Sequence, residues 1–130
     1  MGATEERGKP VVLIVEDDLG HQRLLELLMR RSGFACDCAF DGASGLEKAL
    51  ANTYDLIILD INIPEIDGLE VARRIREHGA KTPLVAVTAL QTRELERKAM
   101  AAGFDGFYQK PIDDAMVSRI TEQFGVGHRH

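Results

Sequence analysis

The stretch VVLIVEDD at residues 11–18 is the part of the sequence that decides the fold. Its first five residues, Val11–Val15, are all apolar, and an unbroken apolar run is typical of a parallel strand covered on both faces. Three acidic residues follow at once, which a buried strand would not choose. The last of them, Asp18, is a favoured residue type for a helix N-cap. The stretch therefore predicts a buried strand, an acidic turn and then a helix.

The same strand-then-helix pattern recurs along the whole chain. We expect four further strands, at 34–40, 56–59, 84–87 and 106–109. Aspartates at 41, 67 and 113 are placed to cap further helices, another helix is expected at 91–102, and Gly33 is placed to end the first helix in a left-handed conformation. Five strands alternating with five helices predict an α/β fold with a parallel sheet. A doubly wound, flavodoxin-like sheet of this size commonly has the strand order 2-1-3-4-5.

Length and composition indicate one ordinary globular domain. The chain has 130 residues, of which 45% are hydrophobic and 28% are charged, and one domain typically takes about 100–200 residues. We expect the domain at 10–124, with tails at 1–9 and 125–130. No apolar run approaches the roughly 20 residues of a membrane span, so we expect a cytoplasmic protein without membrane contact. The net charge of −5 disfavours direct binding to nucleic acid.

Several reactive or charged residues are interpreted as structural. Cys36 and Cys38 lie two apart in an expected strand and so point to the same face, which suits a disulfide poorly. Further Cys or His ligands for a metal are absent from their neighbourhood. The arginines at 73, 74 and 76 are expected to form the solvated face of a helix.

Polar residues end four of the expected strands. They are the acidic run after the first strand, Asp60 after the third, Thr88 after the fourth and Lys110 after the fifth. In a parallel sheet these ends meet at one edge, and the ligands of open α/β sheets bind there. Each residue alone has an ordinary explanation as a helix cap, a β-branched strand residue or a solvated lysine. Their joint arrival at one edge favours a functional site.

An acidic cluster of this kind predicts a cation and phosphoryl chemistry. Close carboxylates repel by roughly 4 kcal/mol per pair at an effective dielectric of 20, so they raise one another's pKa or recruit a cation. The candidate ligands are all oxygen atoms, which favours Mg²⁺ over zinc. An aspartate beside Mg²⁺ can be the nucleophile in phosphoryl transfer. A lysine and a hydroxyl can then stabilise the charge on the phosphoryl oxygens.

The chain resembles the receiver domain of two-component response regulators over residues 10–124. The motifs that carry the resemblance are VVLIVEDD (11–18), DLIILDINIPEIDGLEV (55–71), PLVAVTA (83–89) and AGFDGFYQKP (102–111). The resemblance implies a phosphorylation-controlled signalling switch. Its phosphoryl group would come from a phosphohistidine on a histidine kinase or a histidine phosphotransfer protein. The only catalysis expected is of its own Mg²⁺-dependent phosphorylation and dephosphorylation.

The resemblance also implies roles for residues of the acidic cluster. Asp60 would be the phosphoacceptor. Asp17 would bind Mg²⁺ directly and Glu16 through water, with the backbone carbonyl of Asn62 as a further ligand. Within the family the first acid is more often Asp, so Glu16 is a variant of the pattern.

Further roles are implied for residues around the cluster. Thr88 and Lys110 would contact the phosphoryl oxygens, and the bond from Lys110 to Pro111 is expected to be cis. Thr88 and Phe107 would be the switch residues, although Phe107 lacks the hydroxyl of a tyrosine. Leu90 stands where some rapidly dephosphorylating members carry a polar group, which predicts a long-lived phosphorylated state.

Two surfaces are expected to meet partners. A donor histidine has to pass between the start of the first helix and the loop after the fifth strand, which predicts contacts with Gly20, His21, Leu24 and Pro111. We interpret His21 as a partner-contact or plain surface residue rather than a phosphorylated one. The face made by the fourth helix, fifth strand and fifth helix would meet a downstream protein or a second copy of the chain.

Three alternatives stay open from the sequence. The first is a receiver excised from a hybrid histidine kinase or a multidomain regulator. The second is an aspartyl-phosphate-forming phosphatase, which would want a second acid two residues after the nucleophile, where this chain has Asn62. The third is a flavodoxin-type module that binds a mononucleotide, although the acidic cluster would repel its phosphate. We expect no DNA-binding or enzymatic output domain within these residues.

Overall fold

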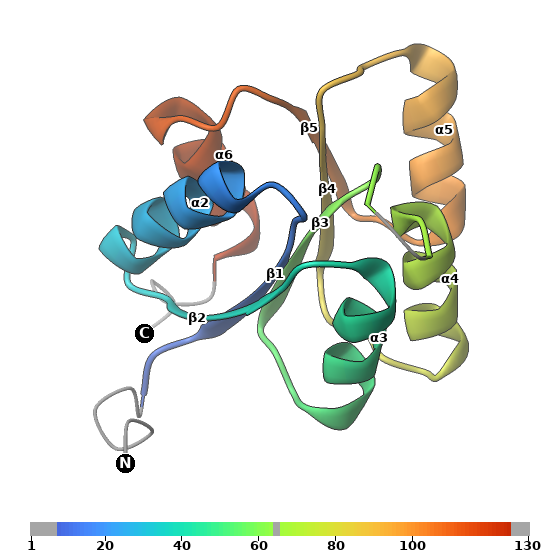
Figure 1. Cartoon of the computed structure of the whole chain (residues 1–130), viewed down its shortest axis with the longest axis horizontal. Coiled ribbons are helices and arrows are strands. Elements are labelled where there is room, and N and C mark those ends of the chain that lie inside the picture. The colour runs from blue at the N-terminus through green and yellow to red at the C-terminus, as the bar shows by residue number, and fades with distance from the viewer. Residues whose placement is uncertain (1–7, 64–65, 126–130) are drawn as a thin grey trace.

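A parallel sheet of five strands forms the centre of the protein. The computed structural model of the chain describes residues 8–63 and 66–125. Within them the strand order is β2-β1-β3-β4-β5 (Figure 1), as the sequence predicts. The strands are β1 (Val11–Val15), β2 (Ala35–Ala39), β3 (Leu56–Asp60), β4 (Leu84–Thr88) and β5 (Gly106–Gln109). The tails expected at 1–9 and 125–130 fall mostly outside the described residues.

Helices cover both faces of the sheet, so the fold is a three-layer, flavodoxin-like α/β fold. Helices α2 and α6 lie on one face, and α3, α4 and α5 lie on the other (Figure 1). Their bounds are α2 (Leu19–Arg31), α3 (Gly42–Ala51), α4 (Gly68–Glu77), α5 (Arg93–Ala102) and α6 (Asp114–Phe124). None of the helices in the described ranges is long and apolar enough to cross a membrane.

The apolar run of β1 is explained by the two helix layers. Successive side chains of a strand point to opposite faces, so Leu13 packs on the side of α3, α4 and α5. Ile14 packs on the side of α2 and α6. Both side chains are fully buried, and each such burial stabilises the fold by roughly 1.5–3 kcal/mol. A polar residue inside β1 would therefore be unfavourable on either face.

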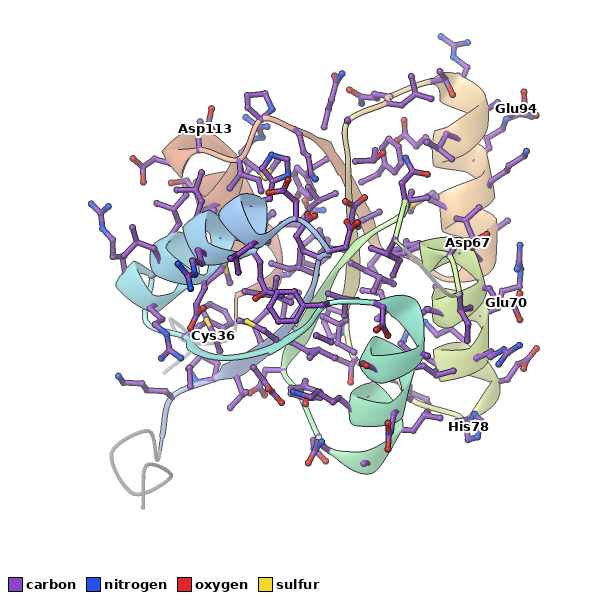
Figure 2. All side chains as sticks on the ribbon, viewed as in Figure 1. Cys36, Asp67, Glu70, His78, Glu94 and Asp113 are labelled. Carbon is purple, nitrogen blue, oxygen red and sulfur yellow. The ribbon has the colours of Figure 1, made fainter. Side chains whose placement is uncertain are left out.

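The expected helix caps are present. Four aspartate carboxylates each accept a hydrogen bond from the backbone N–H three residues further on. The four are Asp18, Asp41, Asp67 and Asp113. Figure 2 labels Asp67 and Asp113. Gly33 follows α2 with a φ of 99°, a conformation that glycine adopts without steric cost. The start of the fourth helix was predicted too early. Helix α5 begins at Arg93 because Thr92 is its N-cap and accepts the N–H of Leu95.

The buried face of α2 differs from the expected stripe of leucines. Leu25 and Leu28 are buried, but Leu24 and Leu27 are exposed, whereas Gln22 is only 3% exposed. Gln22 can be buried because its side-chain amide donates to the backbone carbonyls that end β1 and β2. A buried amide with both donors satisfied avoids the cost of an unpaired polar group.

Two further interpretations can be compared with the structure. Arg73 and Arg74 are exposed and pair with Glu70, as a solvated face requires. The prediction for Arg76 was wrong, because its half-buried guanidinium donates to the carbonyls of residues 80, 82 and 103 and to the carboxylate of Asp105. Cys36 and Cys38 are half-buried and are not joined in a disulfide.

Candidate functional site

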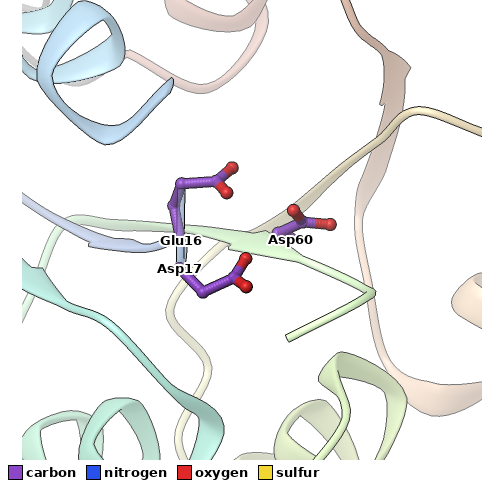
Figure 3. A group of neighbouring side chains, drawn as sticks. All are labelled: Glu16, Asp17 and Asp60. Carbon is purple, nitrogen blue, oxygen red and sulfur yellow. The ribbon is translucent and has the colours of Figure 1, made fainter. Parts of the chain in front are cut away.

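The strand order brings two acidic residues to one point of the sheet edge. Strands β1 and β3 are neighbours, and Val15 pairs with Leu59. The next residues, Glu16 and Asp60, therefore reach the carboxyl edge of the sheet side by side (Figure 3). This is the position in open α/β sheets at which ligands bind.

Three carboxylates form the centre of the site. Oxygen atoms of Glu16, Asp17 and Asp60 lie within 4.8 Å of one another. Glu16 is 2% exposed and Asp60 is 6% exposed, whereas Asp17 is exposed to solvent. In Figure 3 the side chains of Glu16 and Asp17, which follow β1, point toward Asp60. Two buried carboxylates at this distance require positive charge nearby.

Lys110 supplies part of that charge. Its Nζ atom lies 2.9 Å from Oε1 of Glu16 and 3.1 Å from Oδ2 of Asp60. Lys110 follows β5, and its backbone N–H donates to the carbonyl of Thr88 at 2.8 Å. The peptide bond between Lys110 and Pro111 is cis. The lysine therefore reaches across the sheet edge to the carboxylates at the ends of β1 and β3.

Glu16 and Lys110 shift each other's ionisation. Burial raises the pKa of the Glu16 carboxyl and the nearby charge of Asp60 raises it further, while hydrogen bonds from the Asp18 N–H and from Lys110 partly offset this rise. Burial alone would lower the pKa of Lys110, but its hydrogen bonds to Glu16 and Asp60 raise that pKa above the ordinary value. Lys110 is therefore held as a cation at neutral pH.

Backbone groups fix the orientation of both buried carboxylates. The N–H of Asn62 donates to Oδ1 of Asp60 at 3.0 Å, and the N–H of Asp18 donates to Oε2 of Glu16 at 3.0 Å. Gly68 begins α4 directly behind the Asp60 backbone. A Cβ atom at Gly68 would lie 2.7 Å from the carbonyl oxygen of Asp60 and 2.7 Å from Cα of Ile61. Glycine is required there because the displaced atoms would be backbone.

The two expected switch residues lie on the neighbouring strands β4 and β5. Thr88 is completely buried at the end of β4, and its hydroxyl oxygen accepts the N–H of Leu90 at 3.3 Å. Phe107 is half-buried and packs on the cluster shared by α3, α4 and α5. The exposed Leu90 lies in the loop that follows Thr88. The hydroxyl is thus held by its own loop in this state of the protein.

The expected partner residues are all exposed. Gly20, His21 and Leu24 are exposed at the start of α2, and Pro111 is exposed after β5. Nδ1 of His21 lies 3.0 Å from Nζ of Lys110. Neither this contact nor the Gln22 side chain, which links the ends of β1 and β2, was predicted from the sequence. Sequence spacing carries no signal for a contact between residues 89 positions apart.

The site's donor atoms suit a hard divalent cation. Its three carboxylates and one ammonium leave a formal excess of two negative charges. The candidate ligands are oxygen atoms, the kind that Mg²⁺ prefers. Among residues 8–63 and 66–125 this is the one group of three acidic, His or Cys side chains close enough to hold a metal. The acidic cluster can therefore bind a metal ion.

A family model provides the decisive comparison. The model described as the response regulator receiver domain matches residues 12–121. The chain belongs to the response regulator receiver family. Receiver domains are signalling domains of two-component systems, and in response regulators they interact with histidine kinases or phosphotransfer proteins. Membership of this family supports the signalling function over the phosphatase and mononucleotide-binding alternatives.

Individual relatives agree with this assignment. The receiver domain is 40% identical over 110 residues to the response regulator ArlR of Staphylococcus saprophyticus, covering 84% of this chain and 50% of the relative. It thus spans about half the length of the curated relatives that it matches.

Solved structures of receiver domains also agree with the family assignment. The receiver domain of the Francisella response regulator 1452 has a TM-score of 0.82 at 27% identity, covering 88% of this chain and 96% of that one. The receiver domain of the sensor histidine kinase PA1611 from Pseudomonas aeruginosa, which has a magnesium ion coordinated in its active site cleft, has a TM-score of 0.81 at 29% identity. That match covers 89% of this chain and 97% of that one.

Proposed function

We propose that this receiver domain is a cytoplasmic switch that accepts a phosphoryl group on Asp60 from a phosphohistidine of a histidine kinase or phosphotransfer protein. One observation carries the proposal. The Asp60 carboxylate is buried beside the carboxylates of Glu16 and Asp17 and the Lys110 ammonium, and it lies at the end of a central strand. A nucleophile next to fixed positive charge is the arrangement that phosphoryl transfer requires.

The proposed reaction is a simple displacement at phosphorus. A carboxylate oxygen of Asp60 forms the new O–P bond while the P–N bond to the donor imidazole breaks. The bonding electron pair goes to the imidazole nitrogen, which then takes up a proton. With acetyl phosphate as donor, a P–O bond breaks instead and acetate leaves. Lys110 and the Thr88 hydroxyl would bind phosphoryl oxygens, which requires the hydroxyl to leave the N–H of Leu90.

We propose Mg²⁺ as the cofactor of this reaction. Asp17 and Asp60 would bind it directly, Glu16 through water, and the Asn62 carbonyl would complete the protein ligands. Bound Mg²⁺ neutralises charge on the phosphoryl oxygens. The oxygen donor set and its excess negative charge support this assignment, as does the magnesium ion in the PA1611 receiver domain.

The proposed signal leaves the site through Thr88 and Phe107. Moving the Thr88 hydroxyl toward Asp60 would vacate space beside β4, and the half-buried Phe107 ring is close enough in the sheet to fill it, because residues 86 and 107 are paired. Such a local packing change can have a distant readout. We expect it to alter the face of α5, β5 and α6 for a downstream protein or a second copy.

The proposed donor surface consists of Gly20, His21 and Leu24 on α2 and Pro111 after β5. All four residues are exposed, and His21 contacts Lys110 of the acidic site. Leu24 is 39% exposed, so a partner can cover its apolar side chain without unfolding α2. The chain is similar both to ArlR, a response regulator, and to the receiver domain of a sensor histidine kinase. These similarities are consistent with a receiver of a response regulator and with a receiver of a hybrid histidine kinase.

Intact mass after treatment with acetyl phosphate tests the proposal. With Mg²⁺ the protein should gain the mass of one phosphoryl group, and removal of the metal with EDTA should prevent the gain. Asp60→Ala should not be labelled, whereas Asp113→Ala, a change at the N-cap of α6, should be labelled normally. Persistence of the label in Asp60→Ala would show that another residue is the acceptor.

A further inference from the structure

The ammonium of Lys110 has a full set of hydrogen-bond acceptors. A lysine ammonium carries three N–H donors. The structure places three acceptors around it, with Oε1 of Glu16 at 2.9 Å, Oδ2 of Asp60 at 3.1 Å and Nδ1 of His21 at 3.0 Å. A phosphoryl oxygen on Asp60 would be a fourth acceptor. One of the present contacts has to be given up before Lys110 can bind it.

His21 is the acceptor that is released most easily. The contact of Lys110 to Glu16 is an ion pair with a buried carboxylate. The phosphoryl group is attached to Asp60, so it brings its own negative charge to the side of Lys110 that Asp60 already contacts, whereas the imidazole accepts as a neutral ring. A hydrogen bond with charge on both partners is the stronger kind. The His21 side chain is also 47% exposed, so water can replace its partner at little cost. To accept from an ammonium, Nδ1 has to present its lone pair, which places the ring proton on Nε2.

We propose that His21 is a positioning residue, which holds the third donor of Lys110 until a phosphoryl oxygen on Asp60 displaces it. The inference rests on the proposed phosphorylation of Asp60. It adds a second output to the switch, because His21 stands on the exposed start of α2, next to Gly20 and Leu24. Phosphorylation would then directly change the surface at the start of α2, which faces the phosphoryl donor. This change would not require a movement of Thr88 or Phe107.

Imidazole nitrogen spectra test this inference. In ¹⁵N-labelled protein at pH 8 with Mg²⁺, long-range ¹H–¹⁵N correlations should show His21 with an unprotonated Nδ1 before phosphorylation. The signal is assigned by its absence in His21→Gln. Lys110→Met should shift the His21 Nδ1 signal in the unphosphorylated protein, whereas Lys81→Met, a change at an exposed lysine, should leave it in place. An unshifted signal in Lys110→Met would overturn the contact.

The second part of the experiment compares the His21 ring signals before and after phosphorylation. Acetyl phosphate is added until intact mass shows complete labelling, and the His21 ring signals should then move toward those of the Lys110→Met variant. Full labelling with unmoved ring signals would overturn the displacement and leave the proposed function standing. Absence of labelling would overturn the proposed function and the displacement, while the contact is still decided by the Lys110→Met comparison.

A rate measurement provides an independent check. His21→Leu removes the acceptor that competes with the phosphoryl oxygen, so phosphorylation by acetyl phosphate should accelerate by roughly two- to tenfold, the factor of one hydrogen bond that exposure to water weakens. His21→Gln restores an acceptor on a side chain of similar reach and should return the rate toward that of the unmodified chain. An unchanged or slower rate in His21→Leu would contradict the proposed competition.

Discussion

The ammonium nitrogen of Lys110 lies 3.1 Å from Oδ2 of Asp60, although the two residues are 50 positions apart in the chain. Asp60 ends β3, and Lys110 follows β5, with β4 between them in the sheet. The lysine side chain crosses that gap and is only 12% exposed. It is therefore the resident cation of an acidic site, and any metal ion has to share the carboxylates with it.

Removing this resident cation should strengthen metal binding and weaken phosphorylation. In Lys110→Met the carboxylates of Glu16 and Asp60 lose a neighbouring positive charge, so we expect the Mg²⁺ dissociation constant to fall by roughly three- to tenfold after screening. The rate of labelling by acetyl phosphate should fall, because a charge that stabilises the phosphoryl oxygens is lost. The chain has no Trp, so titration calorimetry is the suitable measurement. Lys81→Met is the control, and weaker Mg²⁺ binding in Lys110→Met would contradict the expected competition.

The two neighbouring aspartates after β1 should have different roles, with Asp17 as a metal ligand and Asp18 as a helix cap. Asp17→Asn should weaken Mg²⁺ binding strongly with little effect on stability, because Asp17 is exposed and belongs to the acidic cluster. Asp18→Asn should weaken it less. Asp18→Ala should lower the free energy of unfolding, because its carboxylate accepts the His21 N–H at the start of α2. Urea unfolding without metal and Mg²⁺ titration measure the two effects. Equal losses of metal affinity in Asp17→Asn and Asp18→Asn would reverse the roles.

A charge on the outer face of α2 should slow transfer from a protein donor only. Leu24→Glu places a carboxylate on the proposed donor surface, so the rate of transfer from the cognate phosphohistidine should fall while labelling by acetyl phosphate stays unchanged. Leu50→Glu is the matched control, because Leu50 is also 39% exposed but lies at the end of α3. If Leu24→Glu slowed labelling by both donors equally, the substitution would have damaged the site itself.

The phosphorylated state should be long-lived because the loop after β4 offers no help to an attacking water. Leu90 is 58% exposed and apolar, and a general base at this position could orient water for hydrolysis. Leu90→Glu should therefore shorten the half-life of the phosphorylated protein severalfold without preventing labelling. Met100→Glu, on the exposed side of α5, should leave the half-life unchanged. Time-resolved intact mass after removal of acetyl phosphate measures both, and a half-life in Leu90→Glu that is equal or longer would refute the expectation.

Asp37 should contribute a pH-dependent part of the stability. Burial alone would raise the pKa of Asp37, but hydrogen bonds from Lys48, Tyr54 and the Cys38 N–H lower it overall. A carboxyl with a lowered folded pKa stabilises the protein above its unfolded pKa of about 3.9, and this contribution is lost as the pH falls through the folded value. Asp37→Asn should thus be destabilised at pH 7, by at most about 1 kcal/mol because the side chain is more than a third exposed.

Urea unfolding followed by circular dichroism at pH 7 and at pH 3.5 measures this difference. The gap between Asp37→Asn and the unmodified chain should narrow at the lower pH. Glu122→Gln, on the exposed side of α6, serves as the control. A gap that widened at low pH would show that the carboxylate is not held by its partners as described.

Much of the fold could be predicted because it follows from residue types at fixed spacing. Apolar runs such as Val11–Val15 are recognisable as strands of a covered sheet, and aspartates before apolar helical patterns mark helix starts. These signals are local, so the chain order of the elements is enough to read them. The beginning of α5 was predicted two residues too early, at Gln91. Thr92 is a favoured N-cap residue type, and it accepts the N–H of Leu95, so the helix begins at Arg93.

Side-chain orientation was predicted less well than the position of the elements. The leucines of α2 are similar in type, yet Leu25 is buried and Leu24 is exposed. Gln22 takes a buried position because the carbonyls of Glu16 and Ala39 lie within reach of its amide. Arg76 likewise finds four acceptors in the loops around α4 and α5. These outcomes depend on how a helix lies on the sheet, which periodicity does not report.

The sequence by itself determined that acidic residues, a threonine and a lysine stand at the ends of four strands, because alternating strands and helices place all those ends at one edge. The tertiary structure alone decided which of them touch. Hydrogen bonds and ion pairs act over about 3 Å, and chain spacing cannot specify distances on that scale across three strands. The contacts of Lys110 with Glu16, Asp60 and His21 arise because four segments converge there, each fixed by packing elsewhere in the fold.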